Sequence, residues 1–176
     1  MIAAIRSVRP ARRWLPLLVL LTAGALAGCA SGGAAAAVQR ATQGPTADEV
    51  WVARFVQGYG RLPTFDEQVA WKEGLESRVL AYLSRRPEVA TSPRAGQFRF
   101  QRAVMVGMTK DEVVLLLEQA DTVTSDGAAM REAAGPFWEP IGKRAKEMWT
   151  YPSGWRLYFD GDRLVDVIVA DRRPLE

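Results

Sequence analysis

Three short runs rich in β-branched and aromatic residues constrain the fold most, and they stand near the end of the chain at residues 147–151, 154–159 and 163–169. Asp160-Gly161-Asp162 separates the last two runs, and Asp-Gly between such runs is a strong signal for a β-hairpin. In the middle run Trp155, Leu157 and Phe159 share one face, because side chains alternate along a strand. The pattern predicts a three-stranded antiparallel meander with one face exposed to water and the other covered by helices.

The covering helices are indicated by a Thr-x-x-Glu spacing that occurs three times, at Thr46–Glu49, Thr64–Glu67 and Thr109–Glu112. This spacing is typical of a capping box, in which the Thr hydroxyl and the Glu carboxylate each accept a backbone N–H at the start of a helix. The first two boxes predict a helical hairpin within residues 46–91. The predicted fold class is therefore α+β, with an N-terminal helical hairpin followed by helices packed on the meander.

Two details of the helical part follow from periodicity. A stripe of Val52, Phe55, Val56 and Tyr59 is predicted to form the buried side of the first helix. Residues 92–106 favour a short helix after Ser92-Pro93, although alternating phenylalanines in this segment also fit a strand.

The beginning of the chain has the pattern of a secretory signal peptide. Four arginines and no acidic residue precede a stretch at residues 15–28 that is apolar or small throughout. A stretch of this length is shorter than the roughly 20 residues that a membrane-spanning helix needs. We therefore expect residues 1–28 to be removed as a signal peptide.

The relevant net charge is that of the mature chain, after removal of residues 1–28. The full sequence carries 23 Lys and Arg against 20 Asp and Glu, a formal charge of +3, but the four leader arginines leave 19 basic and 20 acidic side chains. A nearly neutral mature chain gives no reason to expect a nucleic-acid partner.

The single cysteine follows the leader directly. Leu26-Ala27-Gly28-Cys29 resembles the lipobox of bacterial lipoproteins. The resemblance implies cleavage between Gly28 and Cys29, lipid attachment to Cys29 and, because Ala30 follows, transfer to the outer membrane. The alternative is an ordinary cleavage site with an incidental cysteine. Residues 29–45 are predicted to be the lipidated cysteine and a flexible tether.

A second resemblance covers residues 104–169. Gly107-Met-Thr-Lys-Asp-Glu-Val113, then Trp149-x-Tyr151, then a strand ending in Phe159-Asp160-Gly161 resemble the SmpA/BamE family of outer-membrane assembly lipoproteins. In that family a Gly-Met-Thr sequence opens a helix, and two helices pack on a small antiparallel sheet. The resemblance implies an SmpA/BamE-like α+β domain at 92–176. It also implies structural roles for eight residues, namely Gly107, Met108, Thr109, Glu112, Val113, Trp149, Tyr151 and Phe159.

Two departures from the family pattern carry further expectations. Leu117-Glu118-Gln119-Ala120 stands where family members have Leu-Gly-x-Pro, so the helix is expected to run about one turn longer here. Residues 125–146 form a long insertion, read as a loop that presents Phe137 and Trp138 for contact with a partner. The alternative is that these two aromatics fold back to cover the sheet or the helical hairpin.

Catalysis is not expected. The sequence contains no histidine, so a Ser-His or Cys-His pair cannot form and the commonest metal ligand is missing. No cofactor or metal site is predicted. The expected function is that of a non-catalytic protein-binding or assembly module on a periplasm-facing lipoprotein of the cell outer membrane, with an envelope protein as partner. The alternative is an inhibitor or regulator of a periplasmic enzyme, because the two-helix, three-strand unit resembles β-lactamase inhibitory protein domains.

Overall fold

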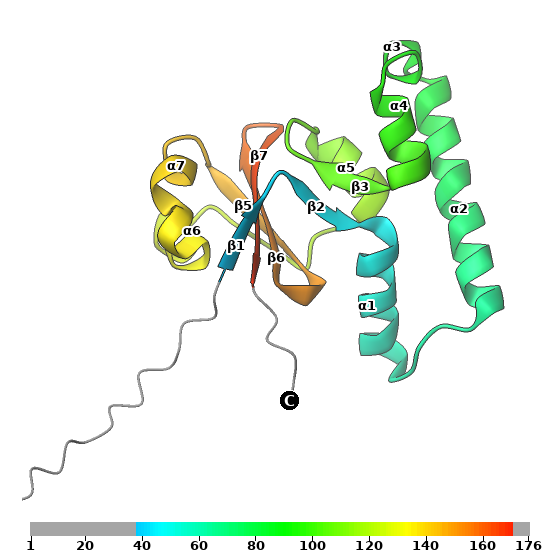
Figure 1. Ribbon diagram of the computed structural model, residues 1–176, viewed down its shortest axis with the longest axis horizontal. Helices are drawn as coiled ribbons and strands as arrows, with labels where there is room; N and C mark the ends of the chain where they lie inside the picture. The colour runs from blue at the N-terminus through cyan, green and yellow to red at the C-terminus, as the bar shows by residue number, and fades with distance from the viewer. Residues whose placement is uncertain (1–37, 171–176) are drawn as a thin grey trace, which may run out of the picture. The chain divides into compact units, whose positions relative to one another are not determined.

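A computed structural model describes residues 38–170 (Figure 1). The predictions for the signal peptide and for Gly28 and Cys29 lie outside these residues. The described residues belong to one compact unit that spans Ala35–Glu176. None of the helices in residues 38–170 has the length and apolar character that a membrane span requires.

The predicted α+β class is confirmed, but the sheet is larger than predicted. It has five antiparallel strands in the order β1-β7-β6-β5-β4. Their bounds are Val38–Ala41 for β1, Thr122–Thr124 for β4, Glu147–Tyr151 for β5, Trp155–Asp160 for β6 and Arg163–Ala170 for β7. A second, two-stranded sheet pairs β2 (Gln43–Thr46) with β3 (Ala103–Met105).

The three predicted capping boxes are all present. They open α1 (Ala47–Tyr59), α2 (Phe65–Ser84) and α5 (Lys110–Leu117). Between α2 and β3 the chain forms α3 (Pro87–Ala90), α4 (Arg94–Gly96) and a π-helical turn, η1 (Gln97–Gln101). Residues 92–106 thus contain the short helix that the sequence favours and also a strand.

Three expectations about segment boundaries are wrong. The predicted tether at 29–45 overlaps β1 and β2, which are too short to produce a readable period. The expected longer helix is absent, because α5 ends at Leu117. The insertion at 125–146 is not a loop, since it contains α6 (Gly127–Ala134), a 3-10 turn η2 (Gly135–Phe137) and α7 (Trp138–Gly142).

The helices cover both faces of the five-stranded sheet, whereas the sequence predicted one exposed face. In Figure 1, α6 and α7 lie on one side of the sheet and α1, α2 and α5 on the other. Alternate residues of β6 illustrate the division, because Leu157 and Phe159 belong to the larger hydrophobic cluster and Tyr158 to the smaller one. All three side chains are fully buried. Helices α6 and α7, which the sequence did not predict within residues 125–146, therefore form the helical layer on the second face of the sheet.

The predicted division at residue 91 is not reflected in the packing. Buried residues of α2, including Leu75, Val79 and Tyr82, share one cluster with Leu157 and Val167 of the sheet. Helices α1 and α2 meet through stacked indole rings of Trp51 and Trp71, with ring centroids 4.7 Å apart. The N-terminal helices thus complete the same core as the C-terminal strands.

Candidate functional site

The family-like motif begins at a sharp bend that joins the start of α5 to the sheet. Gly107 has φ +95°, a conformation that favours glycine. Its N–H donates to the carbonyl of Leu164 (2.7 Å), and the N–H of Leu164 donates to the carbonyl of Met108 (2.8 Å). Met108 is fully buried. The bend is therefore fixed both by hydrogen bonds to β7 and by a side chain in the core.

Thr109 and Glu112 form the capping box of α5. The Glu112 N–H donates to Thr109 Oγ1 (3.2 Å), and the Thr109 N–H donates to Glu112 Oε2 (2.7 Å). Asp111 and Glu112 both lie in the first turn, where negative charge interacts favourably with the helix dipole. These contacts are local and follow from the sequence motif alone.

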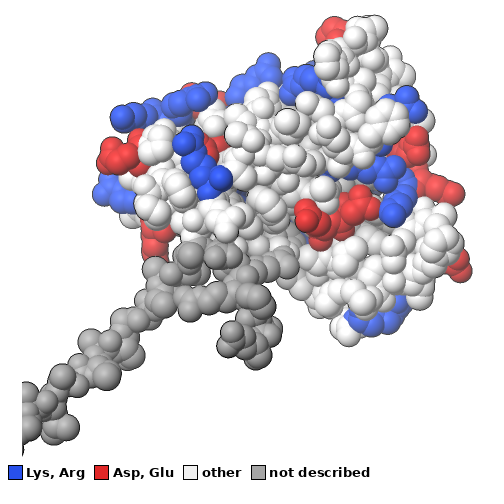
Figure 2. Space-filling view, viewed as in Figure 1, with Lys and Arg blue, Asp and Glu red and all other residues white. Residues whose placement is uncertain are grey.

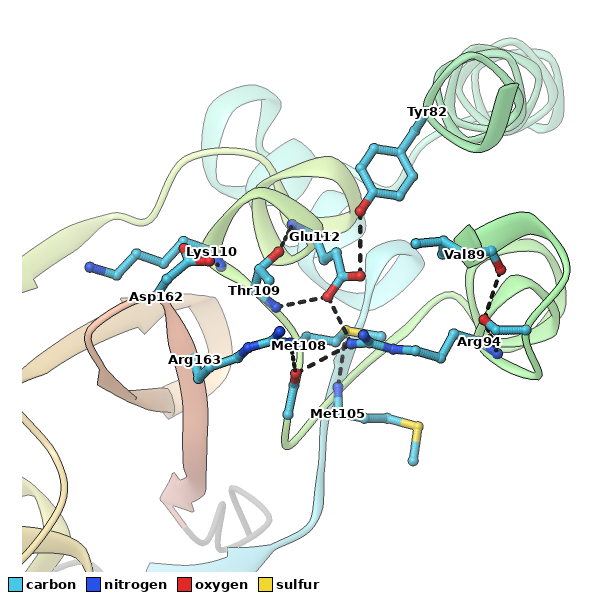
Figure 3. A network of polar contacts seen from close by, with 12 residues as sticks. Tyr82, Val89, Arg94, Met105, Met108, Thr109, Lys110, Glu112, Asp162 and Arg163 are labelled. Carbon is cyan, nitrogen blue, oxygen red and sulfur yellow. Dashed lines mark hydrogen bonds and ion pairs between the residues drawn. The ribbon is translucent and has the colours of Figure 1, made fainter. Parts of the chain in front are cut away.

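The Glu112 carboxylate also connects three helical segments (Figure 3). Its side chain is only 2% exposed. Oε2 accepts a charge-assisted hydrogen bond from Arg94 Nη2 of α4 at 2.8 Å, and Oε1 accepts from the Tyr82 hydroxyl of α2 at 3.3 Å. Burial and the nearby Glu112 charge raise the pKa of Tyr82, which keeps the phenol protonated as a donor. A carboxylate this buried is stable only because donors surround it.

Two arginines extend this network to the bend. The Gly107 carbonyl accepts from Arg163 Nη1 (3.0 Å) and from Arg94 Nη2 (3.3 Å) (Figure 3). Arg163 is the first residue of β7, so the network connects the helices with the start of an inner strand of the sheet. We refer to Tyr82, Arg94, Gly107, Thr109, Glu112 and Arg163 as the Glu112 network.

A second group of motif residues lies beside the first turn of α5. Lys110 Nζ is 2.7 Å from Glu147 Oε2 and 5.6 Å from the ring centroids of both Trp149 and Phe159. The indole N–H of Trp149 donates to the other oxygen of Glu147. Burial opposes ionisation of Glu147, but the hydrogen bonds from Lys110 and Trp149 lower its pKa overall. Lys110 is therefore held over an aromatic surface by a paired carboxylate.

Tyr151 secures the other end of α5. Its hydroxyl donates to the carbonyl of Glu118 at 3.0 Å, and burial raises the pKa of the phenol. Together with Met108, Val113, Trp149 and Phe159, Tyr151 belongs to the larger hydrophobic cluster. The structure thus brings the motif residues, which are up to 52 positions apart, together around α5.

Phe137 and Trp138 do not project from a loop. Both side chains are half-buried and pack against the smaller cluster, which contains Met130, Ile141 and Tyr158. Their position matches the alternative in which these aromatics fold back on the sheet.

The sequence did not indicate a groove of about 830 Å³ beside α1. Val52, Ala53 and Val56 of α1 form one wall, and the other wall includes Trp155 of β6 and Val169 of β7.

The prediction that Val52, Phe55, Val56 and Tyr59 form the buried side of α1 is wrong. The buried residues of α1 are Ala47 and Val50, whereas Val56 is 38% and Tyr59 70% exposed. The sequence pattern alone does not show that part of this stripe lines a groove, because its exposure depends on the tertiary arrangement.

Within residues 38–170 no group of three or more His, Cys, Asp or Glu side chains could hold a metal ion. The charged groups of the Glu112 network hydrogen-bond to one another and to the backbone, an arrangement that stabilises a fold.

Comparison of the chain with protein-family models, curated proteins and solved structures finds no match.

Proposed function

We propose that this protein is a lipid-anchored lipoprotein of the outer membrane that faces the periplasm and binds an envelope protein without catalysing a reaction. Its role is assembly of outer-membrane proteins or maintenance of the envelope. The observation that carries the proposal is the Leu26-Ala27-Gly28-Cys29 sequence at the end of a basic, then apolar leader. The anchor is the lipid on Cys29, and neither a cofactor nor a nucleic acid takes part.

The SmpA/BamE-like character is part of this proposal. Its support is that Met108, just before α5, shares one hydrophobic cluster with Trp149 and Phe159, and that the Gly107 N–H donates to the carbonyl of Leu164 in β7. In the proposed architecture α1 and α2 act as a helical hairpin added to the family unit, and β5, β6 and β7 form its three-stranded meander. Register supports the meander, because β5 pairs with β6 and β6 with β7 in antiparallel fashion.

Protein binding is supported by the surface beside α1. The groove has apolar walls, and Asp48 and Glu49 also line it. Such a site suits a partner segment with apolar side chains and a basic group. Phe137 and Trp138 remain proposed partner contacts through the parts of their half-buried rings that stay accessible.

Replacing the proposed lipidation residue tests the anchor. We expect Cys29→Ser to abolish incorporation of labelled palmitate and to leave the precursor uncleaved, because the thiol is the acceptor of the lipid. Metabolic labelling of the wild-type and variant proteins in the same cells measures both effects. Cys29→Ser protein that still carries the label would contradict the proposal.

A further inference from the structure

Large apolar side chains are exposed at the turn between α1 and α2. Tyr59 is 70% exposed, Leu62 72% and Phe65 78%. We call these three residues the apolar tip. Figure 2 shows a largely uncharged surface at the lower right, where α1 and this turn lie, with basic side chains at its lowest edge. Clustered exposure of this kind marks a surface that binds something apolar.

Three backbone groups of the turn are hydrogen-bonded to side chains or backbone of the turn and its flanking helices. The carbonyl of Leu62 accepts from Arg61 Nη1 (3.0 Å), and the carbonyl of Pro63 accepts from Gln68 Nε2 (3.2 Å). The N–H of Gly60 donates to the last turn of α1 at 2.9 Å. Backbone groups that enter lipid must be satisfied internally, and these three are.

The arginine within the turn, Arg61, is also paired, whereas Asp66 beside Phe65 is exposed and forms no ion pair among the described residues. Arg61 forms a two-bond ion pair with Glu67, with N–O distances of 2.7 and 2.8 Å. The hydrogen bonds from Arg61 and Thr64 lower the pKa of Glu67 to about 2, so the pair persists at neutral pH. The Arg61 guanidinium also lies 5.0 Å from the centroid of the Phe55 ring. An arginine with an apolar stem and a paired head suits the boundary between lipid and water.

The position of the apolar tip matches the place where the chain would meet its membrane. In Figure 1 the start of β1 and the α1–α2 turn both lie toward the lower side of the molecule. Cys29 precedes Val38 by nine residues. Nine residues span at most about 30 Å, so a lipid on Cys29 would keep the start of β1 within that distance of the bilayer.

We propose that the apolar tip inserts into the surface of the phospholipid bilayer that holds Cys29. The inference rests on the proposed function, because the lipid anchor brings the bilayer close. A bilayer is the occupant favoured over a protein, since the exposed apolar side chains lie at a turn on the same side of the molecule as the start of β1, which follows Cys29 by nine residues. Anchoring supplies a high effective concentration, so that three side chains suffice for insertion.

Hydrogen exchange on vesicles tests the insertion separately from natural acylation. Residues 29–176, which contain the whole compact unit, are coupled through Cys29 to a maleimide lipid in phosphatidylethanolamine–phosphatidylglycerol vesicles, or to soluble polyethylene glycol. We expect amides of residues 57–67 to exchange about tenfold more slowly on vesicles. Residues 84–92, at the other end of α2, should exchange equally in both samples. Because the coupling is chemical, this result does not depend on whether cells acylate Cys29.

Matched variants assign the protection to the side chains. Leu62→Ser with Phe65→Ser should abolish the slowing without lowering the melting temperature, because both residues are mostly exposed. Leu80→Ser, which alters a half-exposed residue elsewhere on α2, should retain it. Equal exchange of residues 57–67 on vesicles and on polyethylene glycol would overturn the proposal. Protection that appears in the soluble conjugate as its concentration rises would assign the tip to a second copy of the chain and would also overturn it.

Discussion

The capping boxes of α2 and α5 have the same sequence pattern and nearly the same geometry, yet they differ in what surrounds them. The cap residues Thr64 and Thr109 have φ/ψ values of −70°/168° and −79°/162°, and both boxes make the two reciprocal hydrogen bonds. Glu67 then pairs with the exposed Arg61, whereas Glu112 is 2% exposed and binds donors from two other helices. The motif starts a helix in both places, but only at α5 does it also join separate parts of the fold.

The difference has an energetic consequence. An exposed carboxylate that loses its partner is solvated by water, so the loss is small. A buried carboxylate is stabilised by the groups that hydrogen-bond to it. When the carboxylate is removed, those donor groups stay buried without an acceptor. Arg94 and the Tyr82 hydroxyl would be the donors left behind at Glu112.

The largest effect is expected from truncating the two glutamates in parallel. Glu112→Ala should lower the free energy of unfolding by about 3 kcal/mol, because it removes a buried acceptor and leaves a void in the core. Glu67→Ala should cost roughly a third of that or less. Urea denaturation of both variants measures the difference.

Glu49→Ala is the control for this pair, since it removes the carboxylate of the third, exposed box on α1. Its effect should resemble that of Glu67→Ala. Equal losses of unfolding free energy in all three variants would contradict this expectation, because the burial of Glu112 would then contribute nothing.

The C-terminal ends of α1 and α5 also differ, in the backbone conformation of the residue that caps each helix. The C-cap residue that follows α1 is Gly60 with φ +67°, where glycine is unstrained, but the C-cap residue that follows α5 is Glu118 with φ +63° and ψ −162°. That region of φ/ψ space is almost confined to glycine. Glu118→Gly should therefore raise the free energy of unfolding by about 1 kcal/mol, as measured by urea denaturation.

Glu118→Ala is the matched control. It removes the exposed ion pair with Arg78 in the same way but keeps a Cβ atom. In both variants the carbonyl of residue 118 remains available to the Tyr151 hydroxyl. A gain in stability with alanine as large as with glycine would show that backbone strain is not the cause.

Strong local signals predicted much of the fold. The Thr-x-x-Glu spacings gave three helix starts correctly, and the Asp160-Gly161-Asp162 turn predicted the antiparallel pairing of the last two strands. The elements that were missed lack such signals. Strands β1 and β4 are four and three residues long, too short for alternation to be recognised. They exist because the edges of the sheet supply hydrogen-bonding partners.

The candidate site was predicted only in part. The motif identified Thr109 and Glu112 as a capping pair, since that interaction spans three residues. Nothing local could connect Glu112 with Tyr82, 30 residues earlier, or with Arg94, 18 residues earlier. Likewise, the sequence around Phe137 and Trp138 suggested a loop because Gly135, Pro136 and Pro140 interrupt it. Gly135 caps the C-terminus of α6 with φ +54°, and Pro136 and Pro140 lie in the first turns of η2 and α7, where a missing N–H costs little.

Double-mutant cycles on the two ion pairs test whether the buried capping box of α5 is coupled to a neighbouring helix more strongly than the exposed box of α2 is coupled to its arginine. Arg94→Gln and Glu112→Gln are combined in one cycle, and Arg61→Gln and Glu67→Gln in the other, with unfolding free energies from urea denaturation. We expect a coupling energy of about 1–3 kcal/mol for Arg94–Glu112 and a several-fold smaller one for Arg61–Glu67. Coupling energies that are the same for the two pairs would contradict this prediction.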